Sequence, residues 1–248
     1  MSDVQKYAEI FDYLSAPDAP VSPEPTVVFG RKDPLVARAA GDLVVAGLAG
    51  GIVITGGIGK DSGDILEQGF RSEAHYLGSE LDKNLSRRVP EIKPPHVVLE
   101  EEATNGGENA RNSLAILAER AIDLSHMTGV AHATSARRLG ETLKFEAEKQ
   151  TGGPVVVHRV PSAYRFDPKN PADQKEAAAE LLRMADWPAK GWLGPQTELP
   201  DANLVDFVRD VHGNAPKPVS AWQSALLRRM PVGIRTRVID LASRRHTK

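Results

Sequence analysis

The sequence predicts an α/β protein with a doubly wound, mainly parallel sheet of about five strands and a helical C-terminal region. Two observations support this prediction. Short apolar runs alternate with longer segments of helical periodicity up to residue 160. These runs lack regular polar alternation, which is typical of strands buried on both faces of a parallel sheet. Strands separated by helices require right-handed crossovers, with helices on both faces of the sheet.

The expected elements follow in chain order. Apolar residues at helical spacing predict a helix over 4–14, and four prolines within 15–25 end it. Strands are expected at 26–30, 51–57, 96–101, 129–135 and 155–160, and helices at about 34–48, 72–85, 108–123 and from the fourth strand through Gln150. After Pro161 only helical patterns remain, at 171–186, 203–211 and 219–243 with a break near Pro231. The expected divisions are therefore an N-terminal helix and linker (1–25), a ligand-binding domain (26–165) and a helical C-terminal region (166–248).

Composition narrows the function classes. The 248 residues include 31 Lys or Arg and 33 Asp or Glu, and this balance gives no strong nucleic-acid signal. Cysteine is absent, which excludes disulfides, thiolate metal sites and cysteine nucleophiles. The uncharged segment 43–59 contains six glycines, which favour strand and turn over a membrane span. The N-terminal residues carry acids and no apolar signal core, so a cytoplasmic location is expected. The oligomeric state stays open.

Four loops are expected at the carboxyl ends of the strands, where open parallel sheets bind ligands. The first begins at Gly30, and the other three span residues 55–60, 100–109 and 135–138. The second loop, Thr-Gly-Gly-Ile-Gly-Lys, predicts an anion site, because glycine N–H groups are accessible and Lys60 adds a positive charge. A tight turn that requires glycine explains the same loop equally well.

The third loop leaves a strand with three adjacent glutamates, Glu100 to Glu102, and then starts a helix. Helix capping explains Thr104, Asn105 and Glu108 without a ligand, but it does not explain Asn109. The glutamates need a donor or cation nearby, supplied either by a ligand or by an arginine. In the fourth loop, Arg137 and Arg138 suit a ligand carboxylate or phosphate, and a solvated helix face is the alternative.

Other chemistry is not indicated. None of the seven histidines forms a pair with metal-binding spacing, so no metal is expected, and no catalytic constellation is identifiable. The three tryptophans lie in the helical C-terminal region, where core packing explains them best. The segment 220–248 carries a local charge of +6, which is typical of a solvated helix end but also compatible with contact to nucleic acid or acidic lipid.

The third loop reads VVLEEEATNGGENARNSLAIL and resembles the ElyC/SanA/YdcF family. The resemblance extends to VVFG at the first strand, ITGGIGK at the second, Arg71-Ser72-Glu73-Ala74 in the next helix and Ala221-Trp222-Gln223. It is closest to the cytoplasmic YdcF branch, which implies a Rossmann-like sheet that binds S-adenosylmethionine, with no established reaction. The chain departs from the family at three points. Ala103 stands where a serine is usual, and a glycine replaces the usual threonine before the Glu-Asn pair. The Ser-Ala-Arg-Arg segment after the fourth strand lacks the histidine that many members carry.

The leading hypothesis is a small-molecule-binding protein with S-adenosylmethionine as its cofactor. The predicted contacts are Gly56, Gly57, Gly59 and Lys60 for the anionic part, Glu73, Glu100, Asn105, Glu108 and Asn109 for amine and hydroxyl groups, and Arg71, Arg137 or Arg138 for a carboxylate. Gly30 and Thr104 complete the predicted binding residues. One alternative is an enzyme on a phosphorylated or nucleotide-sugar substrate, with Glu73 or Glu108 as base. Another is a non-catalytic ligand sensor.

Overall fold

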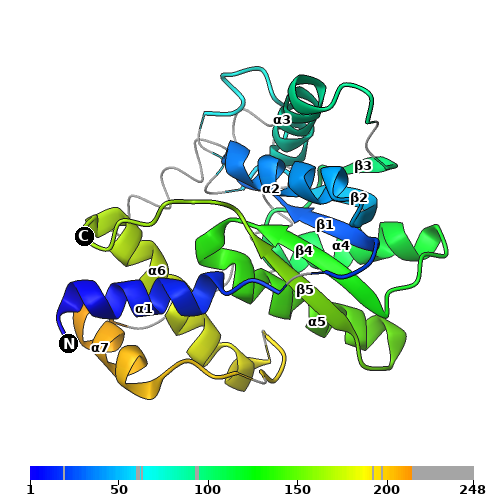
Figure 1. Cartoon of the computed structure of the whole chain (residues 1–248). Coiled ribbons are helices and arrows are strands. Elements are labelled where there is room, and N and C mark those ends of the chain that lie inside the picture. Colours follow the sequence, from blue (N-terminus) through cyan, green and yellow to red (C-terminus); the bar gives the residue numbers. More distant parts are fainter. Residues whose placement is uncertain are drawn as a thin grey trace.

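The computed structural model describes residues 1–18, 20–59, 62, 64–92, 95–191, 193–196 and 198–213 (Figure 1). Its centre is one parallel sheet with the strand order β3-β2-β1-β4-β5. The strands are β1 (Glu24–Phe29), β2 (Ala49–Thr55), β3 (Val97–Glu100), β4 (His126–Ala131) and β5 (Val156–Pro161). The order reverses direction between β1 and β4, which defines a doubly wound, Rossmann-like sheet and confirms the predicted fold class.

Two pairs of helices cover the faces of the sheet. The pair α2 (Pro34–Val45) and α3 (Glu73–Arg88) packs on one face, and the pair α4 (Gly106–Glu119) and α5 (Ala136–Thr151) packs on the other. Neighbouring strand residues alternate between the two cores: Val28 and Ile54 face α2 and α3, whereas Val27 and Val53 face α4 and α5. This alternation explains why the strands read as continuous apolar runs.

A third group of helices forms a layer of its own, called here the helical layer: α1 (Asp3–Ser15), α6 (Pro171–Asp186) and α7 (Ala202–His212). Figure 1 shows α1, α6 and α7 together at one side of the sheet. Ile10 and Leu14 of α1 pack with Leu181 of α6 and Val208 of α7 in one fully buried cluster. The N-terminal helix therefore shares a core with the C-terminal helices, although the sequence separates them.

Local capping signals account for the helix starts. Asp33 and Asn170 cap α2 and α6, and a proline occupies the first turn of each helix. Helix α6 has the predicted bounds. The expected helix at 219–243, Ala221-Trp222-Gln223 and the basic segment 220–248 lie outside the described residues. None of the described helices is long and apolar enough to cross a membrane.

The fourth strand differs from its predicted position. It was expected at 129–135, whereas β4 runs from His126 to Ala131 and is followed by a short 3-10 turn at Ala133–Ser135. The polar residues His126 and Thr128 mask the start of the strand in the sequence. They enter the sheet because β5 pairs with them, and because Thr128 Oγ1 donates a 2.8 Å hydrogen bond to the buried carboxylate of Glu24.

Candidate functional site

The reversal between β1 and β4 creates the candidate site. The loop after β1 leads to α2 on one face, and the loop after β4 leads to α5 on the other. In sheets of this class, loops that diverge in this way mark the carboxyl ends at which ligands bind. The loops after β2 and β3 continue the same edge, so the topology gathers all four sequence-predicted loops along one side of the sheet.

The glycine residues of the first two loops are required by close packing around Glu73. A Cβ atom on Gly30 would lie 2.7 Å from Glu73 Oε2, and one on Gly56, whose φ is +137°, would lie 3.1 Å from it. A Cβ on Gly57 would lie 2.5 Å from the carbonyl oxygen of Glu101. The carboxylate of Glu73 is buried and accepts a 2.8 Å hydrogen bond from Ser62 Oγ.

The N–H groups of the glycine loop are used inside the protein. Gly56 donates to the carbonyl of Glu100, Gly57 to the carbonyl of Ala103 and Gly59 to Ser62 Oγ. The tight-turn interpretation therefore accounts for these glycines, and their N–H groups do not form an open anion cradle in this conformation. Lys60, the cation expected beside them, lies outside the described residues.

The acidic triplet after β3 finds its partners within the chain. Glu100 is buried and accepts hydrogen bonds from Thr55 Oγ1, Asn112 Nδ2 and the N–H groups of residues 102 and 103. Glu101 accepts from Arg71 Nε at 2.7 Å and from Ser72 Oγ at 2.6 Å. Burial alone raises the pKa of Glu101, but these two donors outweigh it and lower the pKa. The nearby-arginine alternative thus accounts for Arg71.

The start of α4 combines a cap with one side-chain atom that the cap does not use. Asn105 Oδ1 accepts from the N–H of Glu108, and Glu108 Oε2 accepts from both the N–H and the hydroxyl of Thr104. Capping thus explains these three residues, as the sequence suggested. The side chain of Asn109 is buried, and its Oδ1 has no hydrogen-bond partner among the described residues. Ser113 Oγ, one turn later, is in the same situation.

Arg137 and Arg138 face the helical layer. Arg137 donates to the carbonyl of Tyr13 and pairs with Glu198 at 2.7 Å, and Arg138 pairs with Glu180 of α6 at 2.5 Å. These carboxylates hold the arginines, which attach the helical layer to the sheet. Arg138 nevertheless remains at the site, because its Nη1 lies 3.1 Å from the point where a Cβ on Gly106 would lie.

The structure adds a polar cluster at the switch point that sequence reasoning missed. His132 directly follows β4 and is 3% exposed. Its Nδ1 lies 2.8 Å from Thr134 Oγ1, and Thr134 donates to Glu176 of α6. Arg31 forms a two-pronged ion pair with the same glutamate, at 2.6 and 2.9 Å. The only sequence signal was a histidine inside the strand predicted at 129–135, which in the structure ends at Ala131.

Burial and the hydrogen-bond chain together determine the charge of His132 and which ring nitrogen carries its proton. Burial and the charge of Arg31 lower the pKa of His132 to about 4, so the ring is neutral at pH 7. Burial raises the pKa of Glu176, but Arg31 outweighs burial and the pKa is lowered. Glu176 is therefore ionised at pH 7 and can only accept hydrogen bonds. The Thr134 hydroxyl therefore donates a hydrogen bond to Glu176 and accepts one from the N–H at His132 Nδ1. The lone pair of His132 Nε2 then points toward Asp33 Oδ2, 3.6 Å away.

The sheet order defines a doubly wound α/β protein, and its loops place a polar candidate site at the carboxyl ends of the strands. Within the described residues, no group of three or more His, Asp or Glu side chains is placed to hold a metal ion. The sequence matches no known family model, and comparison with curated proteins finds no similar sequence.

Proposed function

We propose that the protein binds a small adenosyl-type ligand, most specifically S-adenosylmethionine, at the carboxyl ends of β1, β2 and β4. Doubly wound sheets bind nucleotide-like ligands at this edge. The motif resemblance to the ElyC/SanA/YdcF family supports the choice of S-adenosylmethionine. The cytoplasmic location expected from the sequence stays a prediction.

One observation carries the proposal: Asn109 Oδ1 is a buried acceptor without a donor among the described residues. It lies at the end of β2, where Thr55 Oγ1 is 3.5 Å from the carbonyl oxygen of Asn109. Leaving a buried polar atom unpaired costs about 1–3 kcal/mol, so such atoms are usually paired in the functional state. A ligand hydroxyl or amine supplies the missing donor in this proposal. The buried Glu73 carboxylate, at the start of α3 on the other face, is the second acceptor at the carboxyl edge of the sheet.

The anionic end of the ligand is assigned to the start of α4 instead of the glycine loop. Gly106 and Gly107 begin this helix, and helix N-termini favour negative charge. Arg138 lies beside Gly106, and Arg111 lies beside Gly107, where a Cβ would be 3.4 Å from Arg111 Nη1. A ligand carboxylate at this point would meet two guanidinium groups as well as the helix dipole.

Isothermal titration calorimetry with S-adenosylmethionine tests the proposal. The wild type is expected to bind, and Asn109→Leu is expected to weaken binding about tenfold or more, since it removes the acceptor. Ser113→Ala is the matched control, because Ser113 Oγ is also buried without a partner among the described residues but lies one turn further from the strand ends. Absence of binding by the wild type refutes the ligand assignment. Equal binding by Asn109→Leu and the wild type refutes the role of Asn109.

A second function, an enzyme acting on a phosphorylated or nucleotide-sugar substrate, is favoured by the His132 cluster. The imidazole of His132 is neutral at pH 7, as a general base must be, and Arg31, which is paired with Glu176, belongs to the same hydrogen-bonded cluster. A screen of phosphate esters and nucleotide sugars tests this function. His132→Gln is expected to lower turnover about 100-fold or more, whereas His126→Gln, at the exposed start of β4, leaves it unchanged. Unchanged turnover in His132→Gln excludes the base role.

A further inference from the structure

One edge of the sheet is covered by another segment of the chain, whereas no described segment covers the opposite edge. The outer edge of β5 is covered by the segment before β1, where the N–H of Asp18 donates to the carbonyl of Arg159 at 2.9 Å. The carboxylate of Asp18 also forms a two-pronged ion pair with the Arg159 guanidinium. The opposite edge strand, β3, pairs only with β2 among the described residues. An uncovered edge strand presents backbone donors and acceptors to another chain.

The register identifies the β3 residues that face outward. Ile52 donates to the carbonyl of His96, and Gly56 donates to the carbonyl of Glu100, so residues 96, 98 and 100 direct their backbone groups toward β2. Backbone direction alternates along a strand. The N–H and C=O groups of Val97 and Leu99 therefore point away from the sheet, and no described residue forms a hydrogen bond with them.

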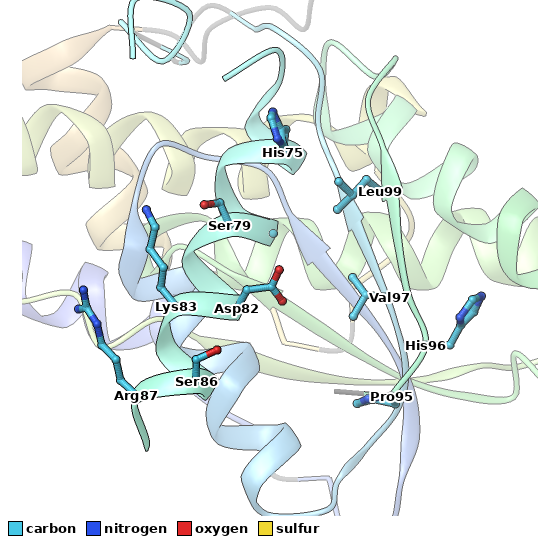
Figure 2. Close-up of a pocket in the computed structure, with 11 residues that line it drawn as sticks. His75, Ser79, Asp82, Lys83, Ser86, Arg87, Pro95, His96, Val97 and Leu99 are labelled. Atoms are coloured by element: carbon cyan, nitrogen blue, oxygen red, sulfur yellow. The ribbon is translucent and has the colours of Figure 1, made fainter. Parts of the chain in front are cut away.

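A groove runs along this edge between β3 and α3 (Figure 2). Its volume is about 890 Å³, Val97 and Leu99 form its apolar side, and Ser79, Asp82 and Arg87 of α3 lie opposite them. Gly78 brings the helix close to the strand, because a Cβ there would lie 3.1 Å from Leu99 Cδ2. The edge strand therefore presents two half-buried apolar side chains, Val97 and Leu99, and the polar residues of α3 lie beside them.

The edge carries opposite charges at its two ends. At the carboxyl end of β3, Glu102 is exposed, and its carboxylate has no partner among the described residues. At the amino end, the exposed side chains of Arg87 and His96 line the groove with Pro95. Arg87 likewise has no ion-pair partner in the described part of the chain. A surface with an acidic end and a basic end complements a copy of itself turned by 180°.

We propose that a second copy of this chain docks on the β3 edge, with the two β3 strands antiparallel around a twofold axis beside Val98. In this register Val97 of one copy lies opposite Leu99 of the other, and the outward N–H and C=O groups of both residues pair across the axis. Glu102 of each copy then approaches Arg87 and His96 of the other. The two five-stranded sheets become one continuous sheet. The site at the strand ends is not required for this assembly.

Sedimentation velocity over a range of protein concentrations tests the backbone pairing. The wild type is expected to associate into dimers. Val97→Pro is expected to weaken the dimer about tenfold or more, because it removes an outward N–H that the sheet of one copy does not use. Val97→Thr keeps this N–H and is the matched control. Circular dichroism and thermal unfolding of each variant show whether the fold is retained.

A charge exchange tests the register. Arg87→Glu and Glu102→Arg are each expected to weaken the dimer, and the double variant is expected to restore it, because the two charges are simply interchanged. A wild type that stays monomeric at all concentrations overturns the proposal. A dimer that survives Val97→Pro in a folded protein also overturns it. Failure of the double variant to recover excludes the antiparallel register.

Discussion

Glu180 on α6 connects the helical layer to the sheet through two arginines. Its Oε2 pairs with Arg138 Nε on α5 at 2.5 Å, and its Oε1 accepts from Arg183 Nη1 on its own helix at 2.5 Å. The residue is 5% exposed. Burial raises the pKa of Glu180, but the charges of Arg138 and Arg183 outweigh it and lower the pKa to about 2. We predict that Glu180→Gln strongly destabilises the fold.

The magnitude follows from this pKa. The value falls from 4.5 in the unfolded chain to about 2 in the folded protein. At about 1.4 kcal/mol per pKa unit, the ionised side chain contributes about 3 kcal/mol to the free energy of unfolding. Because the folded pKa is the lower one, this contribution is fully present above pH 4.5 and is lost as the pH falls toward 2. Glu180→Gln mimics the protonated acid and lacks the contribution at every pH.

Urea unfolding at several pH values between 7 and 3 measures this difference. The wild type is expected to exceed Glu180→Gln by about 3 kcal/mol at pH 7, with the difference shrinking below pH 4.5. Glu80→Gln is the control, since the one ion pair of Glu80 among the described residues is a surface pair with Lys83, and this variant is expected to change stability by less than about 1 kcal/mol. Equal stability of the two variants at pH 7, or a loss in Glu180→Gln that is independent of pH, refutes the reasoning.

Two further predictions concern the strand ends. Because the pKa of His132 is lowered to about 4 from 6.5, the folded state binds a proton less readily than the unfolded chain, and stability falls as the pH drops from 6.5 to 4. Between pH 7 and pH 5 this loss is about 2 kcal/mol, and urea unfolding should show it in the wild type but not in His132→Gln; an NMR titration of the ring near pH 6.5 would contradict it. Gly57→Ala is expected to cost about 1–3 kcal/mol, because the added Cβ meets the carbonyl oxygen of Glu101 at 2.5 Å. Gly51→Ala, which meets nothing within 4 Å in β2, is its control, and equal thermal stability of the two glycine variants would show that the contact at Gly57 relaxes freely.

The sequence alone determined those features that depend on neighbouring residues. Apolar runs without alternation indicated strands buried on both faces, and five such runs with helices between them were enough to predict the doubly wound sheet. Helix α6 has its predicted bounds, because Asn170 and Pro171 define its start locally. The capping roles of Asn105 and Glu108 were readable for the same reason, since the groups that they bind lie within four residues.

Only the tertiary structure decided which partners the polar side chains of the site have. Arg138 pairs with a carboxylate 42 residues away and Arg137 with one 61 residues away, so residue spacing could not identify these partners, and the sequence offered only a ligand or a solvated helix face. The turn at Gly57 was recognisable, but the acceptor of its N–H, the carbonyl of Ala103, comes from another loop. His132 gained its environment from α2 and α6, which approach it only in the folded chain. Short-range hydrogen bonds follow from residue spacing, whereas the pairing of buried charges depends on which elements the sheet order brings together.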